Sequence, residues 1–138
     1  MSGVSRFGVS IETTLLDRFD TAIKQKGYKK RSEAIRDLIR EYLVMKEWQQ
    51  DIETVGVLSL VYSHHSHELQ EKLSGMQHED HDAVISSTHI HLDRHNCLEV
   101  VILKGKSSII QKISEKLSST RGVKHGKLIM TTTGSGLD

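Results

Sequence analysis

The chain of 138 residues contains one cysteine, few aromatic residues and no long apolar run. Its single cysteine, Cys97, cannot form an internal disulfide, and a lone thiol favours a reducing cytoplasm. The longest apolar stretches, such as VGVLSLVY, have the length of strands and are too short to span a membrane. The first ten residues lack the charged and apolar regions of a signal peptide. We therefore expect a cytoplasmic protein with no membrane partner.

An excess of charge of one sign is also missing, because 19 Lys and Arg residues face 18 Asp and Glu residues. The balance shifts along the chain: residues 1–50 carry ten basic and seven acidic side chains, whereas residues 51–138 carry nine and eleven. All nine histidines lie in the second segment. This asymmetry predicts two modules with different partners, at 1–50 and 51–138.

The first module, residues 1–50, has the pattern of one strand and two helices. Apolar and polar residues alternate in RFGVSIE, as in a half-buried strand, and apolar residues then recur at helical spacing in 13–27 and 32–48. Ser32 is the expected N-cap of the second helix.

The predicted strand, residues 6–12, has no partner within its own module. We expect two chains to pair these strands antiparallel, which forms a ribbon of the size that fits the major groove of DNA. The outward side chains of that ribbon are Arg6, Gly8 and Ser10.

The second module, residues 51–138, alternates strand and helix patterns in the order βαββαβ. The expected strands lie at 55–62, 83–92, 97–103 and 127–132, and the expected helices at 67–76 and 107–120. This order predicts an α+β ferredoxin-like unit, in which an antiparallel sheet carries both helices on one face and leaves the other bare. The tail, residues 131–138, is expected to be disordered.

The segment THIHLDRHNC, residues 88–97, holds three histidines and the only cysteine. His89 and His91 are two apart on a predicted strand, so their side chains leave the same face. A hairpin loop with an odd number of residues would place Cys97 opposite His91 on that face, whereas an even loop would place it on the other. Imidazole and thiolate groups bind zinc, nickel and copper, so these ligands leave the metal open.

Other histidines lie in two further segments of the second module. A fourth ligand must come from outside the hairpin, and QHEDHD, with His78 and His81, is the nearest rich source. In SHHSHE, residues His64, His65 and His67 follow a predicted strand, beside His91 or His81, and could bind additional metal weakly.

Five segments of the chain, spread over about residues 4–130, match one family. They are RFGVSIE, GYKKRSEAIRDLIREYL, QHEDHD, THIHLDRHNCLEVVILKG and TRGVKHGKL. Together they resemble the NikR-type nickel-responsive transcriptional repressors. The resemblance implies a ribbon-helix-helix DNA-binding domain followed by an ACT regulatory domain. It also implies a homotetramer, a dimer of dimers, that binds a palindromic operator in double-stranded DNA and represses nickel uptake.

The resemblance also implies a ligand set for one Ni(II) per subunit. His89, His91 and Cys97 of one chain and His78 of a neighbouring chain would bind it, where the bare sheet faces of two chains pair. Glu99, two residues after the cysteine, would orient a ligand histidine.

For DNA, the resemblance gives Arg6 and Ser10 base-reading positions and places Gly8 where the family has a threonine. Arg31 and Ser32, at the start of the second helix, would bind a phosphate. Glu33 and Asp37 would hold a secondary cation, although on any helix such acids also pair with neighbours such as Arg36, Arg40 and Lys30.

Three alternatives to a nickel regulator remain open. The chain could respond to copper or zinc instead, or it could store metal. A metal hydrolase with an open zinc position is a third possibility, but no carboxylate is evidently paired as a general base. We therefore predict no enzyme and no small-molecule substrate.

Overall fold

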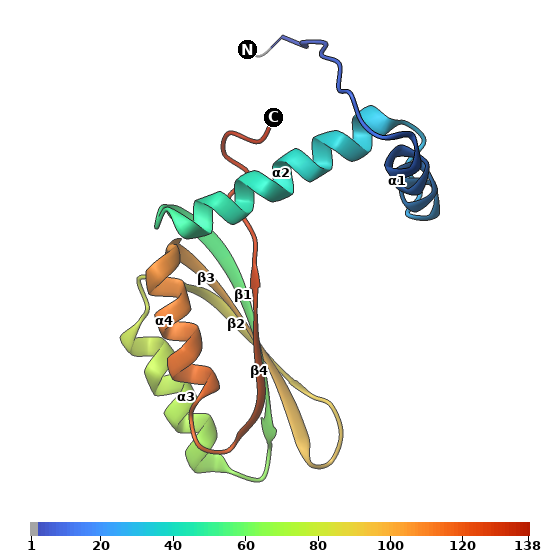
Figure 1. The fold of residues 1–138 in the computed structure, drawn as a ribbon. Coiled ribbons are helices and arrows are strands. Elements are labelled where there is room, and N and C mark those ends of the chain that lie inside the picture. Colours follow the sequence, from blue (N-terminus) through green and yellow to red (C-terminus); the bar gives the residue numbers. More distant parts are fainter. Residues whose placement is uncertain (1–2) are drawn as a thin grey trace. The chain divides into compact units, whose positions relative to one another are not determined.

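The computed structural model describes residues 3–138 and divides the chain into two compact units (Figure 1). Unit 1 comprises Met1–Leu43 with Gly134–Asp138, and unit 2 comprises Val44–Thr133. None of the helices within residues 3–138 combines the length and the apolar character of a membrane span.

Unit 1 contains α1 (Thr13–Gln25) and the first part of α2 (Arg31–Gln49). Gly27 follows α1 with a φ of 98°, a left-handed conformation that glycine adopts without strain, and the chain turns there into α2. Ser32 lies inside α2, one residue after its start, so the prediction that it caps the helix is wrong.

The predicted strand at 6–12 is not formed, because no strand among residues 3–138 pairs with it. Its apolar side chains are exposed: Phe7 is 70% and Val9 is 68% accessible to solvent. The expected disorder of the tail is also wrong in part, since Arg40 Nε donates a hydrogen bond to the carbonyl of Leu137 at 2.8 Å.

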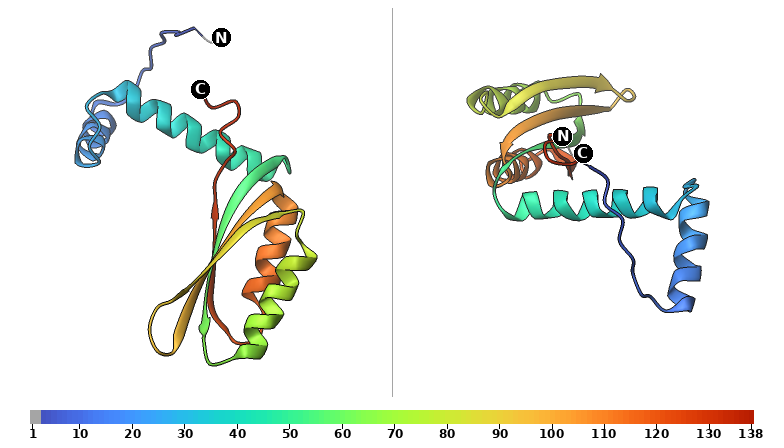
Figure 2. Two further views of the ribbon diagram at one scale, coloured as in Figure 1. Left: turned by 180° about the vertical axis from the view of Figure 1, so that it is seen from behind. Right: turned by 90° about the horizontal axis from the view of Figure 1, so that it is seen from above.

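Unit 2 is an α+β unit with the predicted order βαββαβ. Its elements are β1 (Glu53–Ser63), α3 (His67–Glu79), β2 (Val84–His91), β3 (Asn96–Lys106), α4 (Ser107–Ser118) and β4 (Val123–Met130). All strand pairs are antiparallel, and the sheet order is β2-β3-β1-β4. Helices α3 and α4 both lie on one side of this sheet (Figures 1 and 2).

The core of unit 2 lies between the sheet and these two helices. Burial alternates along β1, so that Leu58, Leu60 and Tyr62 are fully buried toward the helices. They pack in one cluster with Leu73 of α3 and Ile110 of α4. Within the described residues of unit 2, no helix covers the opposite face, where Val57 and Val61 are only half-buried.

Candidate metal centre

The hairpin between β2 and β3 brings two of the predicted ligands together. His91 pairs with Cys97 across the ladder, and His89 pairs with Glu99. Residues 92–96, an odd number, separate this pair, as the placement of Cys97 opposite His91 requires. Asp93 closes the turn, because its Oδ1 accepts hydrogen bonds from the backbone N–H groups of His95 and Asn96 at 2.7 and 2.8 Å.

The ligand side of this hairpin is the face that the helices cover. Cys97 pairs with Tyr62 of β1, and both residues are fully buried in the core. The expectation that the metal lies where two bare sheet faces meet is therefore wrong. In β3, the inward residues alternate with those of the bare face, and Cys97 belongs to the inward set.

A third imidazole joins His91 and Cys97 in the structure. Cys97 Sγ lies 3.8 Å from Nδ1 of His91, and potential ligand atoms of His64, His91 and Cys97 all lie within 4.8 Å of one another. Nδ1 of His64 is buried and has no hydrogen-bond partner among the residues described. Two imidazoles, one of them with a ring nitrogen that has no partner, and a thiol fit a soft or borderline transition-metal ion.

The protonation of two of these groups follows from their surroundings. Burial, and then the charges of Asp93 and Glu99, raise the pKa of the Cys97 thiol. Burial, followed by the neighbouring rings of His65 and His91, lowers the pKa of His64. The imidazole therefore favours its neutral, ligating form, whereas the thiol must lose its proton before it can bind a metal.

His89 takes part in a hydrogen-bond network beside this group. Its Nδ1 lies 3.2 Å from the hydroxyl of Tyr62 and 3.8 Å from Oε1 of Glu99. Glu99 is buried and accepts hydrogen bonds from the hydroxyl of Tyr62 and from Nε2 of Gln77, which lies on α3. The network fixes the orientation of the His89 ring and leaves its other nitrogen, Nε2, within 3.2 Å of Gln70 Nε2.

Four further histidines lie in two other places. His78 lies on α3 beside His81, with ring centroids 6.3 Å apart, and is outside the group at Cys97. His65 of the β1–α3 loop lies against the hairpin loop, where its Nε2 is 3.0 Å from Nδ1 of His95.

His64 was predicted to lie beside His91 or His81, and the structure places it beside His91, with the two ring centroids 5.1 Å apart. Its proximity to Cys97 was missed. The available signal was the fold itself: a ferredoxin-like sheet pairs its first strand with its third, so the residue after the first strand lies at the loop before Cys97. The hydrogen bond from the His64 N–H to the carbonyl of His95 shows this contact.

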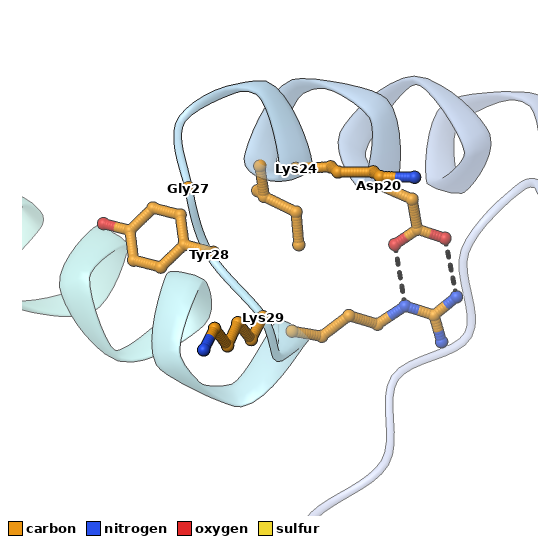
Figure 3. A pocket seen from close by; sticks show the side chains of 7 residues that line it. Asp20, Lys24, Gly27, Tyr28 and Lys29 are labelled. Atoms are coloured by element: carbon orange, nitrogen blue, oxygen red, sulfur yellow. Dashed lines mark hydrogen bonds and ion pairs between the residues drawn. The ribbon is translucent and has the colours of Figure 1, made fainter.

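The predicted DNA-contacting and cation-binding residues lie in unit 1. Arg6, Gly8 and Ser10 are exposed in the unpaired N-terminal segment. The Arg31 guanidinium binds the carboxylate of Asp20, in a cleft between α1 and α2 (Figure 3).

The carboxylate of Asp37, one of the two predicted ligands of the secondary cation, has partners within unit 1. It accepts a hydrogen bond from the Tyr28 hydroxyl at 2.5 Å and lies 3.5 Å from a nitrogen of Arg40. The pairing of Asp37 with Arg40 is the alternative that its helical spacing allows.

Sequence comparisons with known proteins all point to one family. A family model, the NikR C terminal nickel binding domain, matches residues 55–131. A nickel-responsive regulator of Solidesulfovibrio magneticus is 56% identical over 135 residues, which cover 97% of each chain. One from Geobacter sulfurreducens is 55% identical over 138 residues, covering 99% of each chain, and one from Caldanaerobacter subterraneus is 52% identical, covering 99% of this chain and 90% of the relative.

A solved structure shares the fold at lower identity. An uncharacterized protein from Thermotoga maritima is similar with a TM-score of 0.50 and 15% identity, and the match covers 56% of this chain and 95% of that one.

Proposed function

The chain belongs to the family of nickel-responsive regulators, and from that premise we propose that it represses nickel-uptake genes by binding operator DNA when nickel is bound. The family consists of transcription regulators and not of enzymes, in agreement with the prediction from sequence. The observation that carries the proposal is the position of His91 beside the buried thiol of Cys97, with Nδ1 and Sγ 3.8 Å apart, within the part of the chain that the nickel-binding family model matches.

The proposed ligands are His89, His91 and Cys97, with His78 of a neighbouring chain as the fourth, and one Ni(II) per subunit. The hydrogen bond between Nδ1 of His89 and the hydroxyl of Tyr62 supports Nε2 as the ligating atom of that ring. A metal-bound histidine usually makes such a bond through its other nitrogen. The bound nickel would supply a fixed positive charge that joins ligands from two chains.

The proposed DNA-binding domain is residues 1–50, in which two chains pair their N-terminal segments as the strands of a ribbon-helix-helix dimer. The exposed, alternating apolar residues Phe7, Val9 and Ile11 support it, since pairing with a second chain would bury them. Arg6 would then read a base edge, with Gly8 and Ser10 on the same face. Arg31 and Ser32 would contact a phosphate.

The proposed regulatory domain, residues 51–138, has an ACT-like fold and forms the centre of a homotetramer. The half-buried apolar residues on its bare sheet face support assembly through this module. Glu33 and Asp37 are retained as a proposed secondary cation site in the DNA-bound state. A DNA-binding regulator of this kind works in the cytoplasm, where Cys97 stays reduced.

The proposed mechanism is a shift in population among tetramer arrangements. Without ligands joined across chains, the N-terminal dimers would adopt many relative orientations, few of which match a palindrome. Ligands from two chains that share a site would favour the matching orientations. The free energy by which nickel favours the matching arrangements equals the difference between its binding free energies for those arrangements and for the others.

The proposal is tested by titrating the purified protein with Ni(II) and recording its absorption. Wild type should develop a saturable near-ultraviolet band from thiolate coordination, and Cys97→Ala should not. His125→Ala, which removes an exposed histidine of β4, is the matched control and should retain the band. Tetrahedral binding of zinc or copper with no nickel band would favour the alternative metals.

The DNA part of the proposal needs a separate measurement. Duplexes selected from a random-sequence pool by the nickel-loaded protein should share a palindrome, and the metal-free protein should not enrich it. A metal-storage protein would bind nickel but enrich no DNA sequence in either state.

A further inference from the structure

The Arg31 side chain is held within its own chain by two parallel hydrogen bonds. Its Nε donates to Oδ1 of Asp20 at 2.8 Å, and its Nη2 donates to Oδ2 at 2.7 Å. The dashed lines in Figure 3 mark these two bonds, which join the first residue of α2 to the middle of α1. The planar guanidinium and the planar carboxylate therefore meet edge to edge.

The ion pair lies in a basic cleft. The cleft has a volume of about 610 Å³, and Lys24, Lys29 and Arg31 line it together with Asp20. Asp20 is the single carboxylate among three cationic side chains there, so it neutralises only part of their charge. Tyr28 also lines the cleft, but its hydroxyl donates a hydrogen bond to Asp37 and not to Asp20.

The same two donors of Arg31 suit a phosphate group. Arginine binds phosphate and carboxylate in the same two-bond geometry, because both present a pair of oxygens at similar spacing. The Asp20–Arg31 pair is also open to competition, since the two side chains are 37% and 55% exposed. Exposed ion pairs of this kind are weak in water, so an incoming polyanion can displace the carboxylate.

We propose that Asp20 occupies the phosphate-binding position of Arg31 in the DNA-free protein, and that a DNA phosphodiester displaces it on binding. Asp20 is then an autoinhibitory residue that lowers DNA affinity. The inference rests on the proposed DNA-binding function and adds a regulatory contact to it.

The test compares Asp20→Asn with Asp17→Asn in the nickel-loaded full chain. Both substitutions remove one negative charge from α1, but only the first breaks the two-bond pairing with Arg31, because an amide has one acceptor oxygen where the carboxylate has two. Binding of a fluorescein-labelled duplex of random sequence is followed by anisotropy. Asp20→Asn should bind about fivefold more tightly than Asp17→Asn, the factor expected for one exposed ion pair.

Three further readouts separate displacement from a general charge effect. The gain in Asp20→Asn should disappear when Arg31→Gln is added, as a double-mutant cycle measures. The dependence of log affinity on log salt should be the same in Asp20→Asn as in wild type, because Arg31 contacts a phosphate in both complexes, and should become shallower by about 1 in Arg31→Gln. A competition arm with inorganic phosphate should weaken duplex binding no more than sulfate does, because the proposed occupant is a phosphodiester held by the whole interface.

The outcomes are distinct from those of the proposed function. If wild type binds no duplex, the DNA-binding function itself fails. If wild type binds duplex and Asp20→Asn equals Asp17→Asn, only the autoinhibitory contact is wrong. Weaker binding by Asp20→Asn than by Asp17→Asn would also overturn it, because Asp20 would then be a positioning residue that orients Arg31 for DNA.

Discussion

At the scale of single residues, Glu99 links the candidate metal centre to the protein around it. A carboxylate with a side chain only 11% exposed is costly to bury unless polar groups surround it, and here Tyr62, Gln77 and His89 do so. The Tyr62 hydroxyl donates to Glu99, so its oxygen is left to accept a hydrogen bond from Nδ1 of His89. In the proposed site, Glu99 would orient the His89 ring without being one of the ligands.

Substitution of Glu99 should weaken metal binding without removing the site. We expect Glu99→Gln to lower nickel affinity by about 10- to 100-fold, the range found when the hydrogen-bond partner of a ligand histidine is changed. A chelator competition that follows the thiolate band measures it. Glu115→Gln, an exposed acid on α4, is the control and should match wild type. Equal affinity in Glu99→Gln would show that the network only stabilises the fold.

The Asp20–Arg31 pair makes a pH-dependent prediction. The hydrogen bond from Arg31 is the largest cause of the lowered pKa of Asp20, whose ordinary value is 3.8. Because the folded pKa is lower than the unfolded one, the pair stabilises the fold above the unfolded pKa, and this contribution is lost as the pH falls through the folded pKa. Arg31→Gln should raise the pKa of Asp20 toward 3.8, which a carboxyl ¹³C NMR titration measures. An unchanged pKa of Asp20 would show that Arg31 is not what lowers it.

At the scale of secondary-structure elements, substitution of glycine by alanine should have opposite effects on stability at two positions. A Cβ at Gly56 of β1 would lie 2.8 Å from Ile110 Cγ2 and 2.9 Å from Leu128 Cδ1, so Gly56→Ala should cost about 1–3 kcal/mol through overpacking. A Cβ at Gly75 of α3 would meet nothing within 4 Å, and Gly75→Ala should add about 0.5–1 kcal/mol because alanine favours the helix. Urea denaturation of both variants measures the difference, and equal stabilities would contradict the packing at β1.

The elements of unit 2 were predictable because their patterns are local. Alternating apolar residues such as Leu58 and Leu60 mark β1, and the loop parity before Cys97 depends only on spacing. The face that carries Cys97 was not predictable from that spacing, because strand alternation alone does not say which set of residues the helices cover. The position of His64 beside Cys97 depends on pairing between strands far apart in sequence.

The N-terminal segment was predicted as a strand from its alternating apolar residues, but it does not form a strand in a single chain. The alternation of Phe7, Val9 and Ile11 is correct for a half-buried strand, but a strand needs a neighbour to bond its backbone. In the proposed dimer, a second chain would supply that neighbour.

At the scale of the whole molecule, metal binding and DNA binding are assigned to separate units. Cys97 and the residues around it belong to unit 2, whereas the proposed base-reading residues belong to unit 1. A defect in the N-terminal segment should therefore leave the nickel centre intact. This separation distinguishes a regulator with two modules from a protein in which the histidines alone carry the function.

Val9→Lys tests that separation. A charge at the apolar position of the proposed ribbon would be buried between two chains, so its strand pairing should fail and binding of the selected palindrome should fall at least about 100-fold. The thiolate–nickel band should keep its amplitude and midpoint. Val4→Lys adds the same charge at a 97% exposed residue before the predicted strand and should bind DNA as wild type does. If Val9→Lys retains full DNA affinity, the N-terminal segment does not pair as a ribbon, because a ribbon strand cannot bury an unpaired lysine at its centre.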